Sequence, residues 1–314
     1  MKIDITKTAF IFPGQGSQTL GMGKDLSSQY PIAKNTFEEA DSILGFELSK
    51  MMMEGAAEEL NDTVNTQPAL FIHSIAAYRT FTQLYPGLKP ALLAGHSLGE
   101  LSALAAAETF SFEDGLRLVR RRAELMKRAG ELAPGGMAAI LGLDIPVLEK
   151  VCAEASAAED SVQIANDNCP GQVVISGSKP AVERAMSLAK TAGAKRALPL
   201  AVSIAAHSAL MNPIQQEWNE TVLSAKFSNP KIAVIGNVHA APLTDAASAQ
   251  ADLIAQMQSR VRWTESVGYM TSNGIDTFLE VGTGTVLGGL VKRIANGAAN
   301  FPLGTPQDFS ALTE

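Results

Sequence analysis

The sequence predicts an α/β fold: a large, mostly parallel sheet with helices on both faces, interrupted by a small inserted subdomain. Short apolar runs of about five residues alternate with longer helical patterns along most of the chain. These runs are apolar throughout, which is typical of strands buried on both faces of a parallel sheet. The middle of the chain changes to the order βαββαβ, which is the ferredoxin-like pattern.

The larger domain takes its elements from both ends of the chain. The expected strands are Thr8–Phe12, Ala91–Ala94, Ile232–Gly236 and Thr277–Val281. The expected helices are Pro31–Leu44, Gln67–Phe81, a helix that starts at Leu98, Phe110–Arg128 and Val286–Ala295. Pro68 suits a first helical turn, so the second of these helices is predicted to begin at Gln67-Pro68.

The inserted subdomain is predicted to have a sheet of its own. The expected strands are Gly136–Leu143, Val162–Asn166, Val173–Ser176 and Arg196–Leu200, and the expected helices are Pro146–Ala157 and Pro180–Ala192. We therefore divide the chain into a large catalytic domain, residues 1–131 and 201–314, and a ferredoxin-like insert, residues 132–200.

Composition excludes several classes of protein. The chain has 25 Lys+Arg and 32 Asp+Glu, a net charge of −7, whereas proteins that bind nucleic acid carry a basic excess. Its 46% hydrophobic and 18% charged residues do not fit disorder. The sequence has no run of about 18 apolar residues, so no membrane span is predicted. Met1–Asp4 lacks the apolar region of a signal peptide. Two cysteines make no disulfide framework. We expect a cytoplasmic protein with neither membrane nor nucleic-acid partners.

The pentapeptide Gly95-His96-Ser97-Leu98-Gly99 has the G-x-S-x-G form of a nucleophile elbow. It lies between an expected strand and an expected helix, as in hydrolase-like α/β folds. A sharp strand-to-helix turn presents one side chain at its tip, beside N–H groups that favour an oxyanion. The alternative is an ordinary turn that contains a serine. The context favours Ser97 as a nucleophile.

A serine nucleophile needs a base, which is usually histidine. Of the four histidines, His73 lies on an apolar helix and is expected to be a satisfied core residue. His96 adjoins Ser97, and its side chain should diverge from that of the serine, which favours a positioning role. His239 lies in a polar loop and is expected to be exposed. His207 follows the insert, where the chain returns to the larger domain, and is the favoured base.

Arg122 is predicted to lie on the apolar face of its helix. Its neighbours three and four residues away are Leu118, Val119, Leu125 and Met126. A buried guanidinium must be paired, and no acid lies within helical reach. Two interpretations remain: a structural salt bridge to a distant acid, or a fork that receives a substrate carboxylate.

The sequence does not match the motifs of a P-loop, a dinucleotide-binding turn or a metal site. Gly14–Lys24 is rich in glycine, but Asp25 follows the lysine where a P-loop needs Ser or Thr. Gly282-Thr283-Gly284 follows a strand, but Leu287 stands where a third glycine would be needed, so a tight turn is the better interpretation. No cluster has metal-ligand spacing, and we expect neither a metal nor a cofactor.

Eight segments share a pattern that is distinctive when taken together: 12–18 (FPGQGSQ), 66–70 (TQPAL), 95–100 (GHSLGE), 136–140 (GMAAI), 165–168 (ANDN), 170–177 (PGQVVISG), 261–263 (VRW) and 280–282 (EVG). Together they resemble one family, the malonyl-CoA:acyl-carrier-protein transacylases of fatty-acid synthesis, which includes the acyltransferase domains of polyketide synthases. The resemblance covers essentially the whole chain.

The resemblance implies a role for each matching residue. Ser97 would carry the acyl group as an ester, and His207 would act as general base and acid. Arg122 would bind the free carboxylate of the malonyl group. The backbone N–H groups of Gln15 and Leu98 would form the oxyanion hole, in which one donor contributes about 3–4 kcal/mol.

Further matches surround these groups. A backbone carbonyl near Gln256 would orient His207 in place of an acidic residue. Gln67 and Asn166 match residues that line the family's site, and Met126 matches a position beside the malonyl group.

One position departs from the family's pattern. Malonyl-selective members often have a bulky aromatic residue before the histidine, and methylmalonyl-selective members have a serine there. This chain has Ala206, which leaves room for an α-substituent on the acyl group.

The implied activity is a ping-pong transfer of malonyl from malonyl-CoA to the phosphopantetheine thiol of acyl carrier protein, by a monomer. One alternative is a trans-acting acyltransferase of a polyketide line, which has the same chemistry with another carrier. A hydrolase or thioesterase would share the elbow but gives no reason for a buried Arg122. A non-catalytic carrier-binding module would not need Ser97 and His207 together.

The net charge bears on how a carrier protein binds. Carrier proteins are generally acidic, so a partner of charge −7 cannot attract them through its overall field. A local basic patch is needed, and Lys195 and Arg196, at the edge of the insert, are the candidates.

Overall fold

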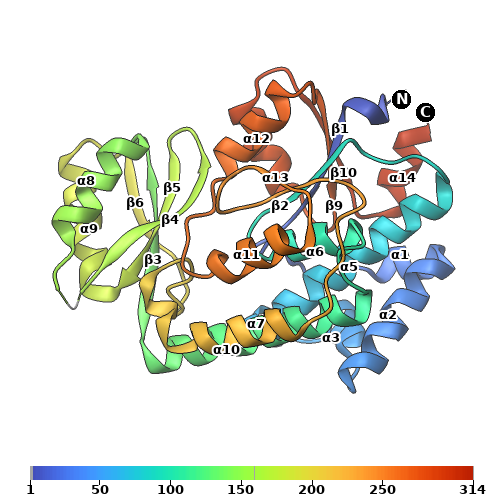
Figure 1. Cartoon of the computed structure of the whole chain (residues 1–314), viewed down its shortest axis with the longest axis horizontal. Coiled ribbons are helices and arrows are strands. Elements are labelled where there is room, and N and C mark those ends of the chain that lie inside the picture. The colour runs from blue at the N-terminus through green and yellow to red at the C-terminus, as the bar shows by residue number, and fades with distance from the viewer. Residues whose placement is uncertain (1–2, 159, 314) are drawn as a thin grey trace.

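The strands of the computed structural model, which describes residues 3–158 and 160–313, form two sheets (Figure 1). The larger sheet has the order β10-β9-β1-β2-β7-β8. Its strands are β1 (Thr8–Phe12), β2 (Leu92–Gly95), β7 (Val234–Ile235), β8 (Pro242–Leu243), β9 (Thr277–Val281) and β10 (Ala299–Leu303). All neighbours are parallel except β7 and β8. The predicted α/β fold is confirmed.

β1 lies inside the larger sheet and is buried on both faces. Because side chains alternate along a strand, Phe10 and Phe12 point to one face, and Ala9 and Ile11 to the other. Each pair belongs to a different hydrophobic core. This explains why the strand is a continuous apolar run in the sequence.

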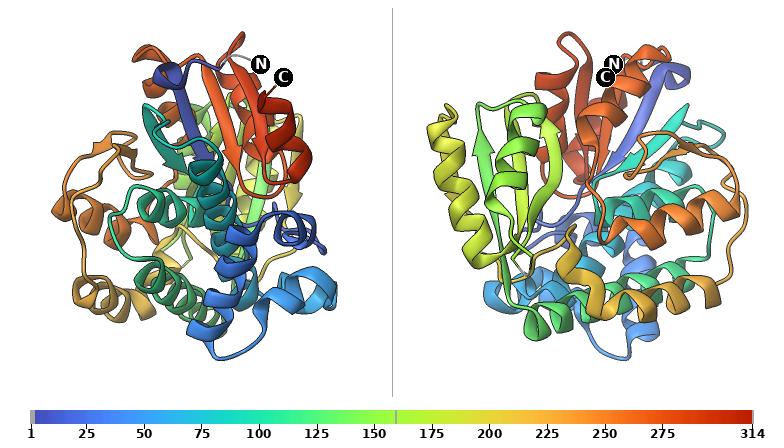
Figure 2. Two further views of the ribbon diagram at one scale, coloured as in Figure 1. Left: turned by 90° about the vertical axis from the view of Figure 1, so that its right-hand side faces the viewer. Right: turned by 60° about the vertical axis from the view of Figure 1, so that its left-hand side comes forward.

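Helices cover both faces of this sheet, as the views in Figure 2 show. The face of Phe10 and Phe12 packs mainly against α2 (Pro31–Leu44), α5 (Thr63–Leu84), α6 (Leu98–Ala106), α7 (Phe112–Leu132), α10 (Asn212–Ser224) and α11 (Ala246–Gln256). The other face packs against α12 (Trp263–Ser272) and α13 (Val286–Ile294). Shorter helices are α1 (Lys24–Gln29), α3 (Leu48–Glu54), α4 (Ala57–Asn61) and α14 (Pro306–Thr313). The two ends of the chain lie side by side.

The smaller sheet is antiparallel and has the order β4-β5-β3-β6. It consists of β3 (Gly135–Leu141), β4 (Val162–Cys169), β5 (Gln172–Ser178) and β6 (Arg196–Pro199), with helices α8 (Ile145–Ala155) and α9 (Lys179–Thr191). Ile140 and Ile175 of the sheet pack with Leu148 and Ala185 of the two helices in a separate core. This is the ferredoxin-like arrangement that the sequence predicts, while the division of the chain at residues 131/132 and 200/201 stays a prediction.

One helix begins earlier than the sequence suggests. α5 starts at Thr63, because the side chain of Asp62 caps it by accepting a hydrogen bond from the N–H of Val64 at 3.2 Å. Pro68 therefore lies inside the helix and leaves the carbonyl of Val64 without its usual donor. The guanidinium of Arg120 supplies one at 2.8 Å. The hydrogen bond from Arg120 of α7 thus replaces the one that Pro68 cannot donate, so α5 can accommodate the proline.

Two strands also differ from expectation. β7 is only two residues long, where a strand over Ile232–Gly236 was expected. β10 was not expected at all, because Asn300 and Pro302 are poor strand formers. It lies at the edge of the sheet, the position where a proline is tolerated in a strand.

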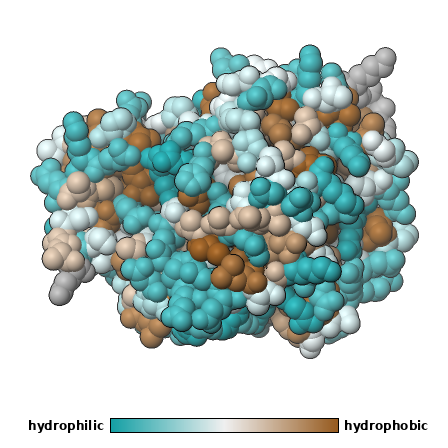
Figure 3. Space-filling model, in the orientation of Figure 1, coloured by the Kyte–Doolittle hydropathy of each residue, from teal (hydrophilic) through white to brown (hydrophobic). Residues whose placement is uncertain are grey.

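Within the described part of the chain, no helix has both the length and the hydropathy needed to cross a bilayer. The face drawn in Figure 3 is mostly hydrophilic, with hydrophobic side chains in small separate groups.

Candidate active site

Ser97 lies at the tip of the turn between β2 and α6. Its φ of 52° and ψ of −106° are strained for a residue with a side chain. Gly95 and Gly99 must be glycines, because a side chain at either position would clash with the neighbouring backbone. A Cβ on Gly95 would lie 1.9 Å from the carbonyl oxygen of Gly99, and a Cβ on Gly99 would lie 2.0 Å from that of Phe12. The backbone can therefore pack closely enough to present the serine.

The Ser97 side chain faces a cavity of about 360 Å³. Eight of the ten predicted site residues line it: Gln15, Ser97, Leu98, Arg122, Met126, Asn166, Ala206 and His207. The insert contributes Met137, Ala139 and Val174 to the wall. The cavity therefore lies where the two sheets face one another. Gln67 and Gln256, the other two predicted site residues, are buried behind the wall.

Ser97, His207 and Gln256 form a chain of hydrogen bonds. The Ser97 Oγ and the His207 Nε2 are 2.8 Å apart, and the His207 Nδ1 is 2.9 Å from the backbone carbonyl oxygen of Gln256. A carbonyl only accepts, so Nδ1 carries the proton and Nε2 is free to accept from the serine. The arrangement presents a histidine in the tautomer that a general base requires.

His207 is buried and neutral. Burial, and next the positive charge of Arg122, lower its pKa from 6.5 to about 3. Its backbone has a φ of 59°, and its carbonyl oxygen accepts a hydrogen bond from the Gln163 Nε2 at 3.1 Å. The same amide donates to the carbonyl oxygen of Gln258 at 3.0 Å. Gln163 belongs to β4, so the smaller sheet helps to hold the histidine in place.

Arg122 is buried beside the nucleophile and has no carboxylate partner among the described residues. Its Nη1 donates to the Gln67 Oε1 at 2.7 Å, and its Nη2 donates to the Gln256 Oε1 at 2.8 Å and to the Ser97 Oγ at 3.1 Å. Burial lowers its pKa to about 10, against the opposing effect of Glu100, so the side chain stays charged at neutral pH. A structural salt bridge, one of the two interpretations of Arg122, is therefore wrong.

Gln67 and Met126 support this arginine from α5 and α7. The Gln67 Nε2 donates to the Thr63 Oγ1 at 3.0 Å and contacts the Met126 Sδ at 3.3 Å. These contacts orient the amide so that its oxygen faces the guanidinium of Arg122. Gln67 is therefore a buried residue that holds Arg122 from behind the cavity wall.

Gln15 and Leu98, the two predicted oxyanion-hole residues, line the same cavity as Ser97. Leu98 is the first residue of α6, so its N–H has no partner within the helix. Gln15 lies in the loop after β1, and the Thr63 hydroxyl holds its side chain by donating to the Gln15 Oε1 at 3.1 Å. Both residues line the cavity. Their N–H groups are available to an oxyanion formed at Ser97.

Sequence reasoning missed Asn237 and the side chain of Gln256. The Asn237 Oδ1 accepts from the N–H of Ser97 at 2.7 Å, and its Nδ2 donates to the carbonyl oxygen of Gly95 at 2.7 Å. The Gln256 Nε2 donates to the carbonyl oxygen of Ser97 at 3.0 Å. Asn237 follows β7, and a polar residue after a parallel strand was the available signal, because sites gather at that edge of such sheets.

The other histidines lie apart from the serine hydroxyl. The His96 Nε2 is 2.8 Å from the Asn168 Oδ1, and the ring packs edge-on against Trp263, so it diverges from Ser97 as expected. His239 is exposed. His73 is a buried core residue, as expected; burial lowers its pKa to about 4 against the opposing effect of the Gly304 backbone, and its Nδ1 has no hydrogen-bond partner.

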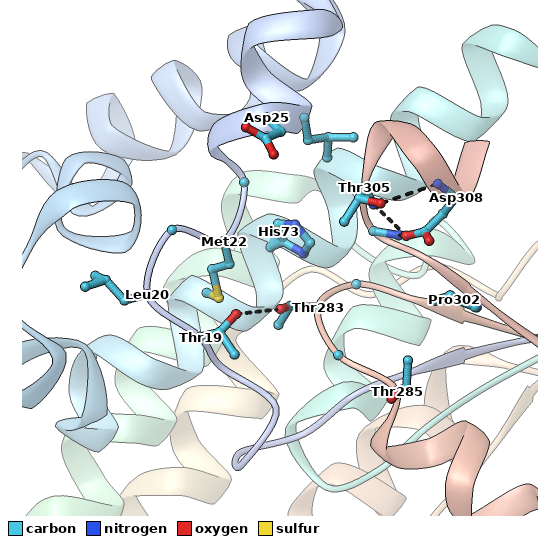
Figure 4. Close-up of a pocket in the computed structure, with 16 residues that line it drawn as sticks. Thr19, Leu20, Met22, Asp25, His73, Thr283, Thr285, Pro302, Thr305 and Asp308 are labelled. Carbon is cyan, nitrogen blue, oxygen red and sulfur yellow. Dashed lines mark hydrogen bonds between the residues drawn. The ribbon is translucent and has the colours of Figure 1, made fainter. Parts of the chain in front are cut away.

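The turn Gly282-Thr283-Gly284 lies beside His73 rather than beside Ser97. It borders a second hollow, of about 430 Å³, shown in Figure 4. There the Thr19 and Thr283 hydroxyls are 3.3 Å apart. No group of three or more His, Cys, Asp or Glu side chains in residues 3–158 and 160–313 is arranged to hold a metal ion.

The arrangement around Ser97 is suited to acyl transfer. A hydroxyl, a neutral base and free N–H donors converge as a covalent acyl intermediate requires. Arg122 adds a positive charge within 3.1 Å of the serine oxygen, where the far end of a short acidic acyl group would lie.

Comparison with known proteins agrees with this geometry. Residues 9–301 match the family model described as the acyl transferase domain. The malonyl CoA-acyl carrier protein transacylase of Haemophilus influenzae is 45% identical over 308 residues, 98% of each chain. An acyl carrier protein S-malonyltransferase from Vibrio cholerae superposes with a TM-score of 0.94 at 45% identity, over 98% of this chain and 99% of that one.

A third structure is a malonyl-transacylase in complex with its type II PKS acyl-carrier protein. It has a TM-score of 0.93 and 42% identity over 98% of both chains. With this coverage by both sequence and structure, the chain belongs to the malonyl-CoA:acyl-carrier-protein transacylase family of acyl transferase domains.

Proposed function

We propose that this protein transfers the malonyl group from malonyl-CoA to the phosphopantetheine thiol of acyl carrier protein, and so supplies extender units for fatty-acid synthesis. One observation carries the proposal: the Ser97 Oγ contacts both the His207 Nε2 and the Arg122 Nη2. A base and a carboxylate-binding cation therefore meet at one nucleophile. The names of the relatives support the same substrates.

In the first half-reaction, the His207 Nε2 takes the proton of Ser97 as the oxygen attacks the thioester carbonyl. The N–H groups of Gln15 and Leu98 stabilise the resulting oxyanion. The intermediate collapses by breaking the carbon–sulfur bond. His207 returns its proton to the departing sulfur, so free CoA leaves and malonyl stays as an ester on Ser97.

In the second half-reaction, the carrier's thiol gives its proton to His207 and attacks the ester carbonyl. A second oxyanion forms in the same place and collapses by breaking the bond to the Ser97 Oγ. His207 then reprotonates the serine. One base serves both directions because the carbonyl of Gln256 holds it in one tautomer, 2.9 Å away.

Arg122 accounts for the choice of a dicarboxylic acyl group. Amide oxygens of Gln67 and Gln256 hold its two terminal nitrogens at 2.7 and 2.8 Å, which fixes the plane of the guanidinium. A malonyl ester on Ser97 would place its free carboxylate against this charge. An acetyl group has no carboxylate and would leave the buried charge without a counterion.

The proposal requires no metal or cofactor, since the acyl group passes from a thioester through a serine ester to a thiol, and Ser97 and His207 provide the covalent and proton-transfer steps. All the residues named above come from one chain, which supports a monomer as the working unit, and we place it in the cytoplasm. The walls of the cavity include Ala206, so the proposal leaves room for an α-substituted malonyl group.

A panel of acyl-CoA donors incubated with phosphopantetheinylated carrier protein tests the function. Mass spectrometry of the carrier should show malonyl transfer in preference to acetyl transfer. Release of free malonate without carrier product would indicate a hydrolase. Malonyl transfer to a polyketide carrier but not to a fatty-acid carrier would assign the enzyme to a polyketide line.

A further inference from the structure

Two acidic side chains are buried together behind the nucleophile. Glu100, in the first turn of α6, is 0% exposed, and Asp252, in α11, is 4% exposed. Both accept a hydrogen bond from the same backbone N–H, that of Asn237, at 3.1 and 3.2 Å. Neither forms an ion pair with any residue that the structure describes. A shared donor brings the two carboxyl groups into direct contact.

One oxygen of each carboxyl group lacks a hydrogen-bond donor from any other described residue. The other oxygen of each has several donors: the Glu100 Oε2 also accepts from the Gln256 Nε2 at 2.9 Å, and the Asp252 Oδ2 from the N–H of Val238 at 3.4 Å. The two oxygens without one, Glu100 Oε1 and Asp252 Oδ1, are buried and receive no donor from another described group. A hydrogen bond between the two side chains requires a proton on one of them, because ionised carboxylates only accept.

Electrostatics points the same way. Burial, and next the charge of Asp252, raise the pKa of Glu100 well above its usual value. Burial also raises the pKa of Asp252. Two adjacent ionised carboxylates in a buried site repel strongly, whereas one shared proton leaves a single negative charge. That charge acts on Arg122, which keeps its own positive charge more readily as a result.

We propose that Glu100 and Asp252 share one proton, and that this singly protonated pair positions the reacting groups through Gln256 and Asn237. Glu100 fixes the Gln256 amide, whose oxygen holds Arg122 and whose backbone carbonyl holds His207. Both acids hold the backbone of Asn237, whose side chain holds the backbone of Ser97. The catalytic consequence rests on the proposed function, but the shared proton does not.

Amide substitutions test the shared proton. In Glu100→Gln, the amide N–H₂ can donate to the Asp252 carboxylate in place of the shared proton, while the amide oxygen still accepts from Gln256 and Asn237. In Asp252→Asn, the new N–H₂ can donate to an ionised Glu100. In the double variant, however, both amides must keep an oxygen where Glu100 and Asp252 accept from Asn237, so neither N–H₂ group has a carboxylate acceptor. The single variants are therefore compatible with the site and the double variant is not.

The expected activities follow. Each single variant should keep malonyl loading of Ser97 within about 3-fold of the unaltered protein, whereas the double variant should lose about 10- to 100-fold, mainly in kcat. Malonyl loading of Ser97 should also be slowed in Glu100→Ala but not in Glu100→Gln. As a matched control, Glu280 is another buried glutamate, bound by the N–H groups of Leu287 and Gly288. In the double variant Glu280→Gln/Asp252→Asn, the loss of malonyl loading should equal the combined losses of the two single variants.

Infrared difference spectroscopy provides a readout that does not depend on activity. The unaltered protein minus Glu100→Gln should show the carbonyl stretch of one protonated carboxylic acid, and the same band should disappear in Asp252→Asn. Absence of that band, or a double variant as active as the singles, would overturn the proposal. A band in a protein that never loads malonyl would instead leave the shared proton standing and refute the proposed function.

Discussion

Side chains from four different parts of the chain contact Ser97. His207 contacts its oxygen at 2.8 Å and Arg122 at 3.1 Å, while Asn237 and Gln256 hold its backbone N–H and carbonyl at 2.7 and 3.0 Å. An isolated serine hydroxyl is a weak nucleophile at neutral pH. Here the base is neutral and already oriented, so little reorganisation is needed when an acyl donor arrives.

Arg122→Ala should abolish the preference for malonyl. Loss of the charge-assisted contact should lower kcat/KM for malonyl-CoA by about 10- to 100-fold, because such contacts contribute about 1.5–3 kcal/mol. Acetyl loading should be kept or raised. Steady-state kinetics with both donors checks this. The control is Arg121→Ala, since Arg121 lies on the outer side of α7 and pairs with Glu217. An unchanged malonyl preference in Arg122→Ala would contradict the role.

Acylation should be insensitive to pH across the range in which an exposed histidine titrates. The His207 pKa is lowered to about 3, so the side chain stays in its neutral, basic form as the pH falls through 6.5. Single-turnover loading of Ser97 between about pH 5 and 8 should therefore show no acid limb near 6.5. A limb at that value would mean that His207 titrates as if exposed.

The same depressed pKa has a consequence for stability, with a definite sign. The unfolded chain takes up a proton on His207 near pH 6.5 and the folded chain does not, so this group contributes stability above pH 6.5. That contribution is lost as the pH falls from 6.5 toward 3. The folded protein therefore becomes less stable on mild acidification while its base stays functional.

The structure brings Ser97, His207 and Arg122, three residues singled out from the sequence, to one cavity. Each has a local signal in the sequence: a glycine-flanked turn, a position after the insert, and a charge on an apolar helix face. Asn237 and Glu100 could not be predicted in the same way. The Asn237 side chain acts on Ser97, 140 positions away, and Glu100 binds the backbone of Asn237, 137 positions away, so neither contact can be inferred from neighbouring residues.

At the level of secondary structure, the site depends on how closely α6 approaches β1. Gly99 packs against the carbonyl oxygen of Phe12, the last residue of β1. The N-terminus of α6 thus reaches the loop that carries Gln15. The close approach of this helix to the loop brings the two N–H groups of Leu98 and Gln15 to the same cavity.

Gly99→Ala should therefore damage both stability and activity. The added carbon would lie 2.0 Å from a backbone oxygen that cannot rotate away, and we expect a loss of about 1–3 kcal/mol in the free energy of unfolding. Gly268→Ala is the matched control, because a Cβ there, in α12, meets nothing within 4 Å. It should raise stability by about 0.5–1 kcal/mol. Urea denaturation compares the two, and equal midpoints would contradict the account of the turn.

The helices and strands differ in how far the sequence predicts them. Strands β1 and β9 were placed at their observed bounds because they are apolar on both faces. The early start of α5 was missed because Arg120, from another helix, compensates for Pro68. β10 was missed because its stability comes from pairing with β9 rather than from its own residues.

At the scale of the whole molecule, the insert does more than form one wall of the cavity. Gln163 of the smaller sheet binds the backbone of His207 at 3.1 Å, and Asn166 forms a parallel bridge with Val261 of the larger domain. The base is therefore held by both parts of the chain. With a net charge of −7, the chain has no overall positive field to attract an acidic carrier, so docking would require a local basic patch.

Lys195 and Arg196 test that idea. Both are exposed at the edge of the smaller sheet, and neither forms an ion pair with a residue in the described ranges. Reversing both charges should raise the KM for carrier protein by about 3- to 10-fold and leave loading from malonyl-CoA unchanged. The control reverses Lys34 and Lys50, which gives the same change in net charge on α2 and α3. An unaltered KM would exclude the patch.

The mass of the intact protein after mixing with malonyl-CoA tests the central claim most directly. We expect one malonyl adduct, mapped to Ser97, that is absent from Ser97→Ala and is removed by phosphopantetheinylated carrier protein. No adduct in the unaltered protein, or an adduct that persists in Ser97→Ala, would contradict the account.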